Sequence, residues 1–142
     1  MPEVSVNALI PAPVDKVWST VTDFGRYEEW NTIHTAFPQG APASLDVGSG
    51  FAEKLTMMGM PADVSWTVKE NQPGSSLLLA GKGPMGVSLT QHYRFAAEDG
   101  GTRVTVDSEF KGAAVNMMAA RIKEATGKAL EESLGKLAKL VE

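Results

Sequence analysis

The 142-residue sequence contains no cysteine, which excludes disulfide bonds and thiolate chemistry. It has only two histidines, and its 13 basic and 17 acidic residues give a net charge of −4. This charge provides no general attraction for nucleic acid or for an anionic membrane surface. A zinc site needs three or four ligands, so two histidines without any cysteine would need additional carboxylate ligands from distant positions. We therefore expect no metal, no other cofactor and no nucleic-acid partner.

Long apolar runs are absent as well. No stretch approaches the roughly 20 apolar residues of a membrane span, and the start, Met-Pro-Glu-Val, has neither the basic nor the apolar region of a secretory signal. Hydrophobic residues make up 43% of the chain and charged residues 21%, an ordinary globular balance. We expect one domain over residues 1–142, cytoplasmic and without stable membrane insertion.

Hydrophobic periodicity predicts an α+β order of elements. Alternation predicts a first strand that ends before Pro11, and apolar residues at helical spacing predict two short helices after it. Period two then dominates residues 40–112, with turns that divide an antiparallel meander, although a strand within residues 33–47 is the element least clear from the pattern. From residue 113 the helical period returns for about 28 residues, a single helix of roughly 40 Å. Gly127 and Gly135 within it indicate either a bend or close packing.

Six of the seven methionines fall at three places, Met57, Met58 and Met60, Met85, and Met117 and Met118. Successive hairpin turns of a meander alternate between the two ends of the sheet. The turns at 58–61 and 83–86 and the link at 111–113 should therefore share one end. Methionine is flexible and polarizable, so the cluster predicts a mouth for an apolar ligand. A plug for the core or a protein–protein patch are the alternatives.

Some polar residues share the inward parity of their strands, where they would fix the orientation of an apolar guest. With the apolar residues of the expected cavity, they give this predicted ligand-binding set: Trp30, Leu55, Met57, Met58, Met60, Trp66, Met85, Leu89, Gln91, Tyr93, Ser108, Met118 and Ile122. The tryptophans are otherwise expected in the core.

The sequence contains no catalytic motif, and the candidates for a catalytic role are Glu53, Tyr93 and His34. An inward Glu53 would be a buried carboxylate usable as a general acid or base, but pairing with a surface lysine is favoured slightly. His34 is expected in a loop and His92 on the surface. Residues 81–86 match G-x-G-x-x-G, yet a strand pattern follows them, which argues against a dinucleotide site. No obvious Glu/His pair is visible, which favours binding over catalysis.

Two segments near the N-terminus carry a family resemblance: Ile-Pro-Ala-Pro-Val-Asp-Lys-Val-Trp at 10–18 and Asp-Phe-Gly-Arg-Tyr-Glu-Glu-Trp-Asn at 23–31. They resemble the opening of the START-like (SRPBCC, Bet v 1-like) superfamily, in its polyketide cyclase/dehydrase-like branch. Gly-Thr-Arg-Val-Thr-Val at 101–106 and the long C-terminal helix extend the likeness over essentially the whole chain. The resemblance implies a helix-grip fold, in which a seven-stranded antiparallel sheet curls around the C-terminal helix and encloses a cavity.

The leading functional hypothesis is therefore binding of a small hydrophobic molecule, lipid or polyketide-like, between the sheet and the C-terminal helix. One alternative is a cyclase or dehydratase that uses the same cavity without metal or nucleotide cofactor. Some actinobacterial members of similar size are described as toxin components, so the other alternative is a toxin-like interaction protein, and a homodimer is left open. Fold membership alone does not decide among these functions.

Overall fold

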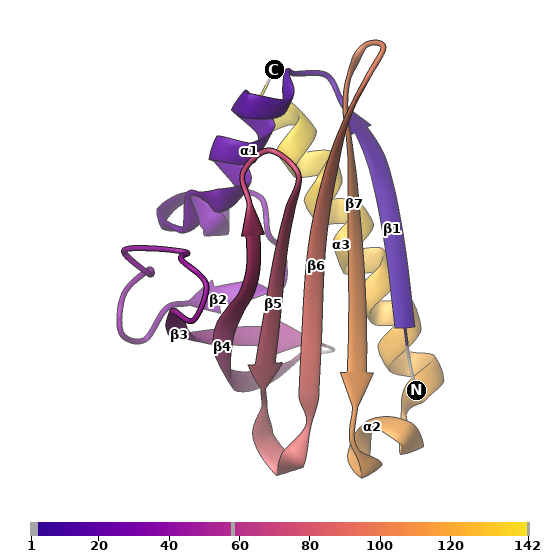
Figure 1. Cartoon of the computed structure of the whole chain (residues 1–142). Coiled ribbons are helices and arrows are strands. Elements are labelled where there is room, and N and C mark those ends of the chain that lie inside the picture. Colours follow the sequence, from indigo (N-terminus) through magenta and orange to yellow (C-terminus); the bar gives the residue numbers. More distant parts are fainter. Residues whose placement is uncertain (1–2, 58, 142) are drawn as a thin grey trace.

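A computed structural model describes residues 3–57 and 59–141, without the side chain of Ala114. The elements in chain order (Figure 1) are β1 (Glu3–Ile10), α1 (Val14–Thr22), the 3₁₀ helix η1 (Phe24–Glu29), β2 (His34–Ala36), β3 (Gly50–Met57), β4 (Met60–Gln72), β5 (Ser76–Lys82), the 3₁₀ turn η2 (Pro84–Gly86), β6 (Ser88–Glu98), β7 (Gly101–Lys111), α2 (Ala113–Met117) and α3 (Ala119–Leu140).

The seven strands form one antiparallel sheet in the order β1-β7-β6-β5-β4-β3-β2. The first strand therefore pairs with the last, in register from Glu3 opposite Glu109 to Ile10 opposite Thr102. In Figure 1 the strands β2 and β3 run across the direction of β5, β6 and β7, which shows how strongly the sheet curls, and α3 runs along the far side of β6, β7 and β1. The predicted α+β helix-grip fold is confirmed.

Alternation of side chains places one face of each long strand against the interior. In β7 the residues Thr102, Val104, Val106, Ser108 and Phe110 are buried, and the residues between them are half-buried. The helix α3 faces these strands with a stripe of buried residues at helical spacing: Ile122, Thr126, Leu130, Ser133, Leu134 and Leu137.

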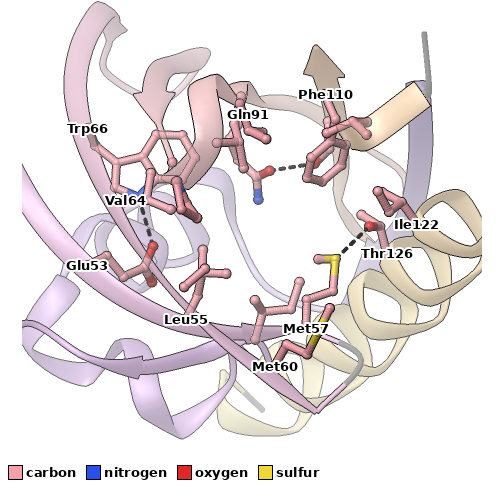
Figure 2. A pocket seen from close by; sticks show the side chains of 18 of the residues that line it. Glu53, Leu55, Met57, Met60, Val64, Trp66, Gln91, Phe110, Ile122 and Thr126 are labelled. Atoms are coloured by element: carbon pink, nitrogen blue, oxygen red, sulfur yellow. Dashed lines mark hydrogen bonds between the residues drawn. The ribbon is translucent and has the colours of Figure 1, made fainter. Parts of the chain in front are cut away.

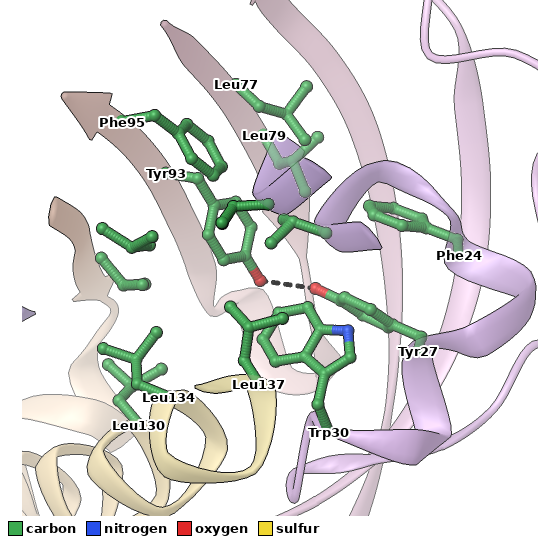
Figure 3. Packing of buried hydrophobic residues seen from close by; sticks show 14 of the residues in the cluster. Phe24, Tyr27, Trp30, Leu77, Leu79, Tyr93, Phe95, Leu130, Leu134 and Leu137 are labelled. Atoms are coloured by element: carbon green, nitrogen blue, oxygen red, sulfur yellow. Dashed lines mark hydrogen bonds between the residues drawn. The ribbon is translucent and has the colours of Figure 1, made fainter. Parts of the chain in front are cut away.

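The main core lies at one end of this interface. Figure 3 shows Leu130, Leu134 and Leu137 of α3 facing Tyr93 and Phe95 of β6, with Trp30 and η1 closing the side. A second, smaller cluster of Phe110, Val115 and Ile122 lies near the α2–α3 junction. The space between the sheet and α3 toward that junction is where the cavity described below lies.

One predicted element differs in the structure. The single helix over 113–140 is wrong, because the chain leaves helical geometry at Met118 (φ −120°, ψ 20°), which separates α2 from α3. Neither proline nor glycine causes the break. The break lies between Val115 and Ile122, which are both buried in one cluster with Phe110. The strand expected within residues 33–47 is present as the three-residue strand β2.

Among the described residues, no helix has the length and apolarity needed to cross a bilayer.

Gly135 should be replaceable with a gain in stability. A Cβ built at this position meets no atom within 4 Å, and α3 continues through it without a break. We expect Gly135→Ala to raise the free energy of unfolding by about 0.5–1 kcal/mol, because alanine loses less backbone entropy on folding. Chemical denaturation measures this change.

Gly101 provides the contrasting control. Its φ of 151° suits glycine, and an added Cβ would lie 2.0 Å from the carbonyl oxygen of Ile10. Gly101→Ala should therefore lower the free energy of unfolding. An equal effect of the two substitutions would contradict this account.

Candidate functional site

A cavity of about 460 Å³ lies between the inner face of the sheet and the α2–α3 region. Its volume falls in the range of about 300–1,000 Å³ that is usual for small-molecule sites. Figure 2 shows the side chains around it, with β3 and β4 on one side and α3 on the other. Most of the lining is apolar, and the polar side chains that contribute to it are Tyr27, Asn31, Glu53, Gln91, Ser108 and Thr126, with the Trp66 indole.

Methionines from all three places in the sequence meet at this cavity. Met57, Met60, Met85 and Met118 line it. Met85 is 84% exposed and Met60 is 54% exposed, which places them at its edge. Met117 is 88% exposed and is not part of the lining, and the predicted residue Met58 lies outside the described residues. The cavity is thus bounded on its open side by flexible thioether side chains.

A contact between Met57 and Thr126 connects the sheet to the helix beside this edge. The Thr126 hydroxyl donates to the Met57 sulfur over 3.3 Å (Figure 2). Thr126 is 1% exposed and belongs to the buried stripe of α3. Its side chain is shorter than the leucines further along the helix, which leaves room beside it.

One polar network runs from the cavity into the core. The Ser108 hydroxyl donates to the Gln91 side-chain oxygen, and these two residues are register partners on β7 and β6. The Gln91 amide donates to the Tyr93 hydroxyl over 3.3 Å, and the hydroxyls of Tyr93 and Tyr27 lie 2.6 Å apart. Ser108, Gln91 and Tyr27 line the cavity, whereas Tyr93 lies behind them in the core.

Both phenols of this network are held in the neutral form. Burial raises the pKa of Tyr93 to about 12, although the hydrogen bonds with Tyr27 and Gln91 act in the opposite direction. Burial also raises the pKa of Tyr27 well above its ordinary value, and the neighbouring Tyr93 and Glu53 add to the rise. The two hydroxyls therefore act as neutral hydrogen-bonding groups at physiological pH.

The second network centres on Glu53, which is 5% exposed. Its Oε1 accepts a hydrogen bond from the Trp66 indole nitrogen over 2.9 Å, and its Oε2 lies 2.6 Å from Nδ1 of His34. The expected pairing of Glu53 with a surface lysine is wrong, because Glu53 faces inward from β3 and both of its carboxylate oxygens contact these two partners. Glu53 lines the cavity and is a candidate proton acceptor there.

His34 is held behind Glu53 rather than in a loop. It opens β2, and its side chain is only 5% exposed. The Asn31 side-chain oxygen accepts hydrogen bonds from the backbone nitrogens of Ile33 and His34, at 3.0 and 3.2 Å, which fixes the chain where β2 begins. The expected loop position of His34 is therefore wrong, and the structure contains the Glu/His pair that the sequence did not reveal.

Most of the predicted ligand-binding residues lie along the cavity: Leu55, Met57, Met60, Trp66, Met85, Leu89, Gln91, Ser108, Met118 and Ile122. Trp30 and Tyr93 do not, since both are buried in the adjacent core, with ring centroids 6.3 Å apart (Figure 3). His92 is on the other face of β6, half-buried, with its Nε2 3.7 Å from Glu70.

Other lining residues were missed at the sequence level. Val64, Leu79 and Phe110 share the inward parity of strands that were recognised, so alternation was a usable signal for them. Tyr27, Asn31 and Thr126 come from helices and the loop after η1. Their approach to the sheet depends on tertiary packing and has no periodic signal.

Removal of the Glu53 carboxylate should lower the free energy of unfolding strongly only when no other hydrogen-bond acceptor takes its place. Glu53→Leu would leave the Trp66 N–H and the His34 imidazole buried without their partner. We expect it to lower the free energy of unfolding by roughly 2–4 kcal/mol. Glu53→Gln retains an oxygen for Trp66 and should stay within about 1 kcal/mol of the wild type. Urea denaturation of both variants measures the difference, and equal losses would contradict the two hydrogen bonds.

Alkaline titration should report the shared burial of the two tyrosines, which are the only ones in the chain. We expect no tyrosinate absorbance near pH 10 in the folded protein, whereas both tyrosines should titrate near pH 10 in denaturant. A raised pKa means that the folded state holds the proton more tightly, so its contribution to stability is complete below about pH 10. That contribution is lost as the pH rises through about 12. Native titration near pH 10 would contradict this expectation.

Comparison with known proteins places this geometry in a family. The chain matches the family described as "Polyketide cyclase / dehydrase and lipid transport" over residues 1–142. Toxin Rv0910 of Mycobacterium tuberculosis is 29% identical over 115 residues, which are 81% of this chain and 80% of that protein. The structure of protein CV1439 from Chromobacterium violaceum aligns with a TM-score of 0.78 at 16% identity, covering 100% of this chain and 99% of that one. TTHA0849 from Thermus thermophilus aligns with a TM-score of 0.79 at 15% identity, over 99% and 97% of the two chains. Because the family match extends from end to end, this protein belongs to the polyketide cyclase/dehydrase and lipid transport family.

Proposed function

We propose that the protein binds a small, largely apolar molecule in the cavity between the sheet and α3. The observation that carries this proposal is the composition of the cavity wall. The cavity of about 460 Å³ is lined mainly by apolar side chains, with a few polar groups that include Tyr27, Glu53, Gln91 and Ser108. Ligand pockets have this composition, since apolar surface supplies affinity and a few polar groups fix orientation.

Packing energetics support the same proposal. Protein interiors are normally filled to the density of organic crystals, and a void deprives its lining of favourable contacts. A guest would restore those contacts and remove apolar surface from water, at about 25 cal/mol per Å². The methionines at the edge suit guests of different shape because their side chains are flexible. Family membership, which includes lipid transport by its description, agrees with a small-molecule ligand.

An enzyme of the cyclase or dehydratase type is the second candidate, and the Glu53–His34 pair favours it. A carboxylate 2.6 Å from an imidazole can accept a proton from a bound molecule and share it with the histidine. The proposed binding function does not depend on this step, because the apolar wall supplies affinity whether or not the guest reacts.

A toxin-like interaction protein is the third candidate. It is supported by the 29% identity to Toxin Rv0910 and by the exposed side chains of Met60 and Met85, which could meet a protein partner or a second copy of this chain. In that case an apolar probe would bind at the edge rather than inside the cavity, and filling the interior would leave its affinity unchanged.

Binding of N-phenyl-1-naphthylamine, followed by its fluorescence, tests the proposal. We expect saturable binding of one probe per chain. Ala62 lines the cavity opposite Leu55 in the β3–β4 register, so Ala62→Trp places a large ring in the guest's space. It should weaken binding by about tenfold or more, because each 1.4 kcal/mol of lost contact is a factor of ten.

Thr90→Trp is the matched control. Thr90 is exposed on the outer face of β6, so the same ring is added without filling the cavity. Its affinity should equal that of the wild type, and circular dichroism checks that both variants fold. Equal affinity of all three proteins would show binding elsewhere, and the absence of saturable binding to the wild type would refute the proposal.

A further inference from the structure

The described part of the cavity wall carries negative charge and no positive charge. Of the described residues that line the cavity, none is lysine, arginine or histidine, and Glu53 is the one carboxylate. Tyr27 is the other titratable group in the lining, and burial keeps it neutral by raising its pKa. A guest that brings its own negative charge would therefore find no cation in this wall to pair with.

The partners of Glu53 determine what its carboxylate offers to a guest. The Trp66 indole nitrogen is a donor only, so Oε1 must act as an acceptor toward it. Oε2 faces Nδ1 of His34, which lies outside the cavity lining. The hydrogen bond between these two atoms points away from the guest. Toward the cavity, the Glu53 carboxylate offers lone pairs as acceptors.

The other polar groups of the wall are neutral. The Gln91 amide donates one of its two N–H groups to Tyr93, and Tyr27 already shares a hydrogen bond with Tyr93. The remaining N–H of Gln91 can donate to any oxygen of a guest, but it carries no charge that would offset a carboxylate. Two carboxylates in one apolar cavity repel each other strongly because the local dielectric constant is low. A hydroxyl or ammonium group meets no such penalty, and it can donate to the spare lone pair of Glu53.

From this arrangement we infer that the cavity selects apolar molecules whose polar end is a hydrogen-bond donor, an alcohol, a phenol or a protonated amine, and rejects those that end in a carboxylate. The inference rests on the proposed binding function and names the class of ligand for that site. It excludes free fatty acids and includes neutral or cationic amphiphiles.

Three naphthalene derivatives that differ at one substituent test this selectivity: 1-naphthylmethylamine, 1-naphthalenemethanol and 1-naphthoate. Each displaces N-phenyl-1-naphthylamine in competition at neutral pH. The decisive comparison is between the amine and the carboxylate, because both carry one charge and both lose hydration on entry. We expect the amine and the alcohol to bind roughly 10- to 100-fold more tightly than naphthoate, the range of a hydrogen bond to a charged group.

Glu53→Gln assigns the selectivity to Glu53, because it removes the charge and retains an oxygen for Trp66. It should reduce the ratio of amine to carboxylate affinity by about tenfold or more. Glu109→Gln is the matched control: Glu109 lies on β7 between inward-facing residues, near Lys111, and is not part of the cavity lining. It removes the same charge and should leave the ratio unchanged.

The outcomes separate this inference from the proposed function. Naphthoate binding as tightly as the amine to the wild type would overturn the inference while N-phenyl-1-naphthylamine binding still supported the cavity. An unchanged ratio in Glu53→Gln would overturn the role of Glu53. Failure of every probe, including N-phenyl-1-naphthylamine, would refute the proposed function itself. The wild-type ranking tests the inference even if a variant fails to fold.

Discussion

The cavity exists because one helix must cover a strongly curled seven-stranded sheet, and its side chains fill only part of the space. Toward its C-terminal end, α3 presents Leu130, Leu134 and Leu137, which complete the main core with the aromatic residues of η1 and β6. Toward its N-terminal end it presents Thr126 and Ile122, which line the cavity instead. The short side chain of Thr126 contributes to the hollow part, whereas the leucines pack into the solid part.

Polar residues mark the boundary between these two regions. Gln91 and Ser108 line the cavity, and their network passes into the core through Tyr93 and Tyr27. Such groups are stable next to apolar packing because each has a hydrogen-bonding partner. The wall can thus carry hydrogen-bonding capacity toward a guest without the cost of buried, unsatisfied groups.

The fold is widespread among proteins of very different sequence, as the TM-scores near 0.78 at about 16% identity show. A shared fold of this kind does not carry a shared ligand, since function depends on particular side chains set on a common frame. For this chain those side chains are the carboxylate of Glu53, held by Trp66 and His34, and the methionines at the edge. They distinguish its cavity chemically from a cavity with a cationic wall.

Sequence alone was sufficient for whatever depends on periodicity. Alternation along β6 and β7 identified Leu89, Gln91 and Ser108 as inward-facing, because a strand turns successive side chains to opposite faces. Hairpin order also predicted that distant methionines would meet, because each turn reverses the chain.

Tertiary structure alone decided which inward groups touch. Glu53 meets His34 only because the short strand β2 pairs with β3, and Tyr27 reaches Tyr93 across 66 positions because η1 packs over the sheet. The helix break at Met118 also has no signal in the sequence pattern. Periodicity indicates the direction in which a side chain faces, whereas strand register, sheet curl and packing determine which residue it contacts.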